Sequence, residues 1–149
     1  NDKYTKTYAE KIMMCEPCQV SPMHFHWNKM EDIINRGGGD IEFSLYNATP
    51  DEQLADTDVE ICQDGRRWNV PAGQKIVLHP GDSLSLYPYY YHEFVIPEDS
   101  SAVLIGEVSM CNDDNTDNRF LKPLGRFPTI EEDEAPYRLL CTEYPKAND

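Results

Sequence analysis

Residues 24–31 read His24-Phe25-His26-Trp27-Asn28-Lys29-Met30-Glu31, two histidines and a carboxylate at short spacing. In a β-strand, side chains two residues apart point to the same face, so His24 and His26 are expected to face one cavity. Two imidazoles at this spacing can chelate one cation, and Glu31 follows after a short turn and can add a carboxylate oxygen. Such mixed nitrogen and oxygen donors suit Mn, Fe, Co, Ni or Zn, and ligand softness does not choose between these metals.

A fourth ligand has to come from elsewhere in the chain, which has four histidines in all. His92 follows Pro88 and an aromatic run at the start of a predicted strand. His79 lies beside the Pro80-Gly81 turn, where a surface residue is expected. The histidine count and positions therefore favour His92 as the fourth ligand. The alternative for the His-x-His pair by itself is two surface residues on a polar face.

Outward from this stretch, the sequence predicts an all-β domain. Ile41, Phe43 and Leu45 alternate with polar residues, as in a half-buried strand, and Asp64-Gly65 is typical of a hairpin turn. Further extended segments are predicted at residues 4–14, 59–61, 68–70, 75–78, 83–87, 92–96 and 102–110. The best helical signal is a short turn around residues 29–34, and residues 137–141 are expected to form a strand or a docking segment. Short strands between tight turns indicate a sandwich or barrel.

Composition limits the choice of partners. The 149 residues carry 27 acidic and 13 basic side chains, a net charge of −14. We therefore expect no nucleic-acid partner and no anionic membrane partner, because both require basic surfaces. No apolar run approaches the roughly 18 residues that span a bilayer, and no secretory signal is visible, so a cytoplasmic protein is expected.

The five cysteines do not predict a zinc or redox site. Cys15 and Cys18 form a C-x-x-C pair, but the other three are scattered singly. The pair falls in an apparent strand-to-turn stretch and not at the start of a helix, where a thioredoxin-type motif would lie. Incidental thiols in a reducing compartment are the expected interpretation.

The histidine stretch resembles the first motif of the cupin superfamily. His24-x-His26, four residues, Glu31, six residues and Gly38 match that motif. Pro80-Gly81-Asp82, Pro88 and His92 resemble the second motif. The second motif usually reads P-x-G-x-x-H, and here the segment from Pro88 to His92 is one residue shorter and has no glycine. The resemblance implies a cupin-type β-barrel, also described as a double-stranded β-helix or jelly roll.

Flanking segments resemble the D-lyxose isomerase (D-lyxose ketol-isomerase) family over nearly the whole chain. The resemblance rests on the segments at 8–12, 22–27, 31–39, 106–109 and 112–114, including Arg36-Gly37-Gly38-Gly39. It implies interconversion of D-lyxose with D-xylulose and of D-mannose with D-fructose, one divalent metal ion with manganese preferred, and a homodimer. Longer family members carry extra N-terminal sequence, so we expect residues 1–149 to form a single cupin domain that lacks this extension.

The family's metal ligands correspond to His24, His26, Glu31 and His92, and Lys29 matches an active-site lysine. Isomerisation requires removal of a proton next to a carbonyl, and a carboxylate has to carry it between two carbons. Glu107 is our candidate, because it follows an apolar strand where an unpaired acid would be costly. The alternatives are a salt-bridged or exposed acid at position 107 and a solvated surface lysine at position 29. We expect the sugar pocket to be lined by Glu10, Lys11, Asp114, Asn118 and Phe120.

Two other functions are compatible with these residues. One is a non-catalytic sugar-binding or sensory cupin. The other is a different metal-dependent enzyme on the same ligands, such as an epimerase or a dioxygenase, since the fold alone does not determine the chemistry.

Overall fold

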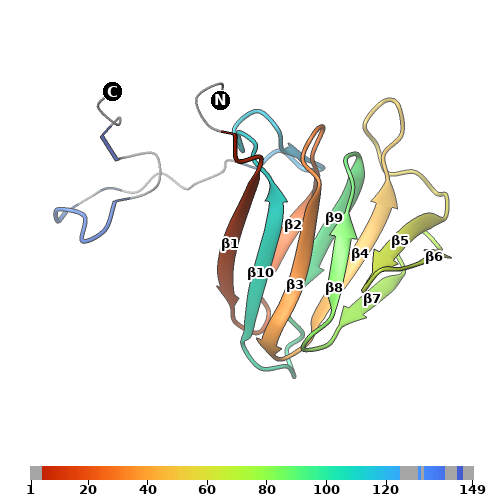
Figure 1. The fold of residues 1–149 in the computed structure, drawn as a ribbon, viewed down its shortest axis with the longest axis horizontal. Coiled ribbons are helices and arrows are strands. Elements are labelled where there is room, and N and C mark those ends of the chain that lie inside the picture. The colour runs from red at the N-terminus through yellow and green to blue at the C-terminus, as the bar shows by residue number, and fades with distance from the viewer. Residues whose placement is uncertain (1–4, 125–130, 132, 140–143, 146–149) are drawn as a thin grey trace.

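The computed structural model describes residues 5–124, 131, 133–139 and 144–145 of the chain. Within these residues it contains eleven strands and no helix (Figure 1). The strands are β1 (Tyr8–Cys15), β2 (Val20–Phe25), β3 (Glu31–Gly38), β4 (Ile41–Asn47), β5 (Val59–Gln63), β6 (Arg66–Val70), β7 (Lys75–Leu78), β8 (Ser83–Leu86), β9 (Tyr90–Val95), β10 (Val103–Met110) and β11 (Arg119–Phe120).

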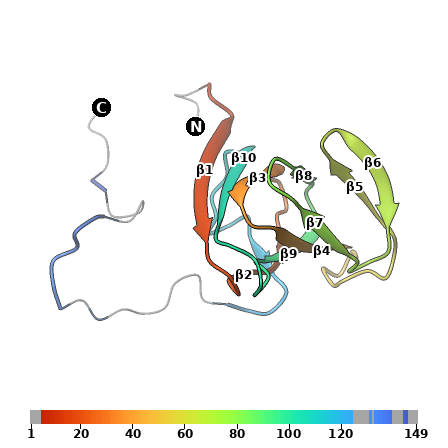
Figure 2. The same cartoon turned by 90° about the horizontal axis from the view of Figure 1, so that it is seen from below.

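The strands form two antiparallel sheets that face each other. One sheet has the order β1-β10-β3-β8-β5-β6 and the other the order β11-β2-β9-β4-β7. Seen from below, β1 and β2 lie at the same side of the molecule, and the β5–β6 hairpin lies at the opposite side (Figure 2). The predicted all-β architecture is confirmed.

The space between the sheets is apolar in one part and polar in another. On β10, Val103 and Ile105 are buried, and the same interior face continues with the buried Glu107 and Ser109. An apolar cluster that includes Phe43 occupies the interior between the sheets. The polar ends of the central strands therefore place ionisable side chains inside the barrel.

The helical turn expected around residues 29–34 is wrong, because Glu31–Gly38 is a central strand. It pairs with β10 on one side and with β8 on the other. Its alternating pattern buries Glu31, Ile33 and Asn35 on one face. The hairpin predicted at Asp64-Gly65 is confirmed, since both residues have positive φ (51° and 75°) between β5 and β6, as two-residue hairpin turns require.

The terminal predictions are only partly covered by the described residues. The first strand begins at Tyr8, and Tyr4 lies outside the described part. In the tail, residues 137–139 are exposed and form no strand, and Cys141 lies outside the described residues. Cys15 and Cys18 are both free thiols, at the end of β1 and in the following turn. The described part contains no helix long and apolar enough to cross a membrane.

Candidate metal centre

The four predicted ligands meet in the polar part of the interior. His24 on β2 and His92 on β9 are direct cross-strand partners, and Glu31 opens β3 in the opposite sheet. His26 lies just beyond the end of β2. One donor atom from each of these residues lies within 4.8 Å of the others, and all but His24 are buried.

A tight turn before β9 replaces the glycine of the usual second cupin motif. Tyr89 adopts a left-handed conformation with φ of 63°, which is unfavourable for a bulky residue. Its N–H donates to the carbonyl oxygen of His26 at 2.9 Å. Its ring lies against Phe25, with centroids 5.3 Å apart. The shorter segment from Pro88 to His92 thus still brings His92 to the cluster, and Tyr89 provides the turn.

Backbone carbonyls fix the orientation of all three imidazoles. The Nδ1 atoms donate to the carbonyl oxygens of Pro22 (from His24, 2.7 Å), Asp117 (from His26, 2.8 Å) and Tyr90 (from His92, 2.9 Å). A carbonyl oxygen can only accept, so each Nδ1 carries the proton in these bonds. In the neutral rings, each Nε2 then presents a lone pair, as it does in metal-binding histidines.

The donor set fits a divalent cation. Oε1 of Glu31 lies 3.4 Å from Nε2 of His26 and 3.1 Å from Nε2 of His92. Lone pairs and a carboxylate oxygen repel one another at these distances unless a proton or a metal cation lies between them. The Nε2 atom of His26 is also buried without a hydrogen-bond partner, which is costly for a polar atom. A cation would relieve both penalties.

The environment keeps two of the ligands unprotonated. Burial, and then the nearby His92, lower the pKa of His24 from its ordinary value to about 3. Burial by itself would raise the pKa of Glu31, but its neighbours, among them the Lys29 ammonium at 2.7 Å, hold it well below its usual range. Both groups are therefore in the form that binds a metal.

Lys29 and Glu107 adjoin the ligands. The Lys29 Nζ atom lies 2.7 Å from Oε2 of Glu31 and 3.2 Å from Oε1 of Glu107, and the Lys11 Nζ atom lies 3.0 Å from the same Glu107 oxygen. Lys29 is only 4% exposed, so the interpretation as a solvated surface lysine is wrong. Burial by itself would lower the pKa of Lys29, but the two carboxylates raise it above its ordinary value. Glu107 is both buried and paired.

A cavity of about 70 Å³ opens onto Lys29, Glu31, His92 and Glu107. A larger hollow of about 340 Å³ shares Met13, Ser21 and Phe94 with this cavity, so the two adjoin.

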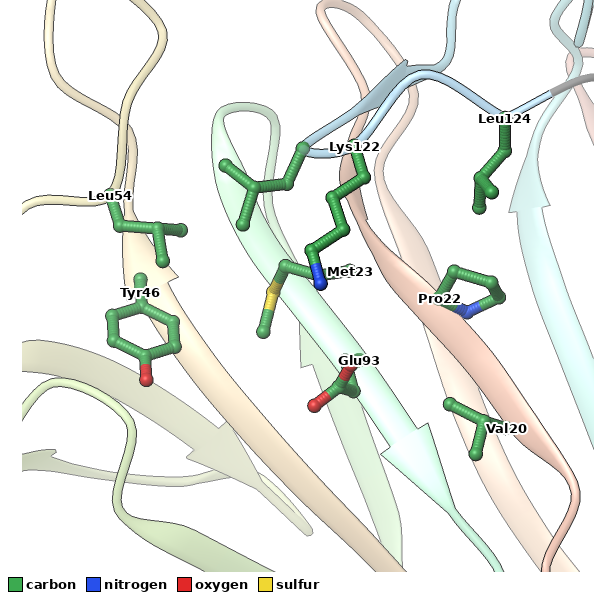
Figure 3. Close-up of a pocket in the computed structure, with 9 residues that line it drawn as sticks. Val20, Pro22, Met23, Tyr46, Leu54, Glu93, Lys122 and Leu124 are labelled. Atoms are coloured by element: carbon green, nitrogen blue, oxygen red, sulfur yellow. The ribbon is translucent and has the colours of Figure 1, made fainter.

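A separate hollow of about 330 Å³ lies elsewhere, over β2, β9 and β4. Figure 3 shows it between Met23, Tyr46, Glu93 and Lys122, and none of the proposed metal ligands lines it. It is mostly apolar, and it shares Val20 with the hollow beside Met13 but no residue with the cavity at the ligands.

The predicted sugar-binding residues are placed unequally. Lys11 joins the cluster through Glu107, and the ring of Phe120 lies 5.3 Å from the ring of His24. Asn118 donates to the carbonyl oxygen of Asp114 at 2.8 Å, and its own Oδ1 atom is buried without a partner. The structure does not bring Glu10 to the site. It is exposed on the opposite face of β1 from Lys11, where it pairs with Arg36.

Two residues that the sequence analysis did not single out hold the site together. Asp117 is buried beneath the 26–29 segment. Glu52 accepts hydrogen bonds from Trp27 (2.9 Å) and Arg119 (2.8 Å). Asp117 and Glu52 contact residues that are distant in the sequence, and neither belongs to a recognisable motif, so no sequence signal pointed to them.

Comparisons with known proteins agree with this geometry. The profile of the D-lyxose isomerase family matches residues 1–144. The D-lyxose/D-mannose isomerase of Serratia proteamaculans is 55% identical over 141 residues, which cover 95% of this chain and 62% of that protein. The chain thus spans less than two thirds of that relative.

Solved structures share the fold. The L-ribose isomerase of Cellulomonas parahominis superposes with a TM-score of 0.58 at 20% identity, over 78% of this chain and 58% of that one. A cupin 2 domain-containing protein from Halorhodospira halophila superposes with a TM-score of 0.53 at 10% identity, over 78% and 59% of the two chains. The cupin fold and the match along 144 residues together establish that this chain belongs to the D-lyxose isomerase family.

Proposed function

We propose that the chain carries the active centre of a metal-dependent isomerase that interconverts D-lyxose and D-xylulose, and D-mannose and D-fructose. Family membership and the name of the Serratia relative support this substrate class. The observation that carries the proposal is the cluster of three imidazoles and one carboxylate, all buried except His24, with Glu107 and Lys29 beside it in one cavity.

His24, His26, Glu31 and His92 would hold one divalent cation, for which we propose manganese over zinc, cobalt, nickel or iron. Nitrogen and oxygen donors of this kind accept all five metals. The bound cation would act as a Lewis acid that stabilises negative charge developing on the sugar oxygens. We further propose a cytoplasmic homodimer that binds neither nucleic acid nor membrane, in line with the net charge of −14.

Glu107 is proposed to carry the proton between C2 of the aldose and C1 of the ketose. Its burial and its position in the cavity that also opens onto Lys29 and Glu31 support this role. Lys11 and Lys29 both donate hydrogen bonds to Oε1 of Glu107, which leaves Oε2 as the oxygen to receive the proton. Lys29 keeps its charge and would polarise a sugar oxygen.

Lys11, Phe120, Asn118 and Asp114 are proposed to line the sugar pocket. The cavity at the ligands is small, so the sugar is expected to extend into the adjoining hollow beside Met13. Glu10 faces away from this space and would contribute only indirectly.

The proposal is tested by isomerisation in heavy water with manganese-loaded protein. Deuterium at C1 of the ketose is expected, because a carboxylate that holds the proton exchanges it with solvent. Glu107→Gln should keep the metal and lose turnover by about 10²–10⁴-fold, the usual effect of removing a general base. Glu93→Gln is the matched control, since Glu93 is on β9 next to His92 but lines the separate hollow (Figure 3).

Three results would contradict the proposal in different ways. Absence of any ketose from metal-loaded protein would exclude the isomerase. Normal turnover in Glu107→Gln would move the base elsewhere, with Asp114 the next residue to substitute. An inactive Glu107→Gln without solvent label in the wild-type product would show that Glu107 positions the sugar and that hydrogen moves as hydride.

A further inference from the structure

Asp117 has the densest set of hydrogen bonds around the site. Its Oδ1 atom accepts from the backbone N–H of Asn28 (2.9 Å) and from the Asn28 side chain (3.1 Å). Its Oδ2 atom accepts from the backbone N–H of Lys29 (3.0 Å) and from the side chain of Asn112 (3.4 Å). Its carbonyl oxygen accepts from Nδ1 of His26. One residue, distant in sequence, thus contacts three of four consecutive residues, 26–29.

The chemistry of these bonds requires a carboxylate. All four groups that face the side chain are N–H donors, two on each oxygen, and the residue is only 4% exposed. A buried carboxylate is tolerated when such bonds satisfy it. An asparagine at this position would turn an NH₂ group toward one pair of donors. A side chain that only filled space would not need to be a carboxylate.

The bonds act on two functional side chains together. The Asp117 carbonyl holds the proton on Nδ1 of His26 and leaves Nε2, the buried atom without a partner, directed at the cluster. The Asp117 carboxylate anchors the backbone of Lys29, whose ammonium reaches both Glu31 and Glu107. We propose that Asp117 is a positioning residue, which sets His26 for metal binding and Lys29 for contact with the substrate. This inference rests on the metal-dependent function proposed above.

The decisive variant is Asp117→Asn, with the protein loaded with cobalt(II) as a visible probe. We expect the cobalt dissociation constant to rise about 10–100-fold, as is typical when a group that orients a metal ligand is lost. The d–d absorption of the bound cobalt should change, and turnover at saturating metal should fall. Asp113→Asn is the control. The Asp113 carboxylate accepts from Asn115 within the same loop, and among the described residues it forms no hydrogen bond with residues 26–29. The cobalt affinity and spectrum of Asp113→Asn should therefore stay at wild-type values.

A lower melting temperature of Asp117→Asn, with wild-type cobalt affinity and spectrum in the folded protein, would overturn the proposal and leave a structural role. If Asp117→Asn does not fold, Asn28→Ala removes one donor to Oδ1 and keeps the backbone bonds. It should raise the cobalt dissociation constant by a smaller factor, and an unchanged constant would count against the proposal.

Failure of the isomerase proposal is distinguishable from failure of this one. The ring ¹⁵N shifts of His26 in metal-free protein need neither cation nor sugar. They should show a single tautomer protonated at Nδ1 in the wild type. Asp117→Asn keeps the backbone carbonyl that bonds to Nδ1, but the disturbed side-chain bonds to residues 28 and 29 should let this carbonyl shift, so a mixture of tautomers is expected. Wild-type protein that binds cobalt but converts no sugar would refute the isomerase alone. Identical tautomers and cobalt constants in both proteins would refute the role of Asp117 alone.

Discussion

Lys29 is the residue at which the ligand set and the proposed proton carrier meet. Its ammonium lies between the carboxylates of Glu31 and Glu107, and Lys11 adds a second positive charge on Glu107. Two carboxylates and two ammonium groups balance before any cation binds. A divalent cation would then leave the cavity positive, which favours a substrate on which negative charge develops.

The first prediction concerns the ligand contributed by β9. His92→Ala should bind manganese at least about 10-fold more weakly than wild type, because one of four donors is lost. Elemental analysis after dialysis measures the bound metal directly. His79→Ala is the control, since His79 is exposed and pairs with Asp40 at 2.9 Å, away from the cluster. Full metal content in His92→Ala would remove His92 from the ligand set.

The cluster of candidate ligands could be predicted from the sequence, whereas the groups that contact and support it could not. His24, His26 and Glu31 lie within eight residues, and their chemistry identifies them. Asp117 accepts hydrogen bonds from the backbone N–H groups of Asn28 and Lys29, far away in the sequence. Every residue except proline has such an N–H group, so the residue types at 28 and 29 do not indicate the contact. Glu10 was expected at the site, but the two-residue periodicity of β1 turns it away from Lys11.

At the scale of elements, β3 shows the limit of local patterns. The window from 29 to 34 includes the turn before the strand, so its apolar residues appear at a spacing that a helix also allows. Pairing with β10 and β8 determines the outcome, and both partners are far away in the chain. Strands bounded by glycine or proline turns, such as β7 and β8, were predicted to within one residue.

The second prediction concerns the close approach of β3 to the segment before β10. Gly38 has φ of 100°, and a Cβ atom there would lie 2.0 Å from the carbonyl oxygen of Ala102. Gly81 has φ of 103° and no atom within 4 Å of its Cβ position. Both alanine variants should lose about 1–2 kcal/mol through backbone strain, and Gly38→Ala should lose about 1–3 kcal/mol more through the clash. Urea denaturation measures the difference. Equal losses would mean that Ala102 moves aside freely.

At the scale of the molecule, the two sheets share the ligand set. His24 and His92 come from one sheet and Glu31 from the other, so the site exists only when the sheets are packed together. The class of fold could be predicted from strand and turn signals, because those depend on local composition. Which strands lie opposite one another in the two sheets depends on the strand order, and the residue pattern does not specify that order.

The third prediction follows from this shared site. A cation that binds only the folded chain raises the free energy of unfolding by about 2.7 kcal/mol at 100 times its dissociation constant. The urea midpoint should therefore rise with manganese concentration and return to its starting value with a chelator. His92→Ala should show little of this rise. A midpoint that does not depend on manganese in the wild type would contradict the assembled site.

The division of ligands between the sheets also bears on local opening of the barrel. A fluctuation that separates the sheets at their polar end exposes the amides of β2, β3 and β9 to solvent, and it would have to release the cation first. Hydrogen exchange of these amides should therefore slow by the factor with which the cation favours the closed state. The β5–β6 hairpin lies at the opposite side of the molecule and contributes no ligand (Figure 2). Its amides should exchange at the same rate with and without metal. The cation would therefore suppress local opening only in the half of the barrel that holds the ligands.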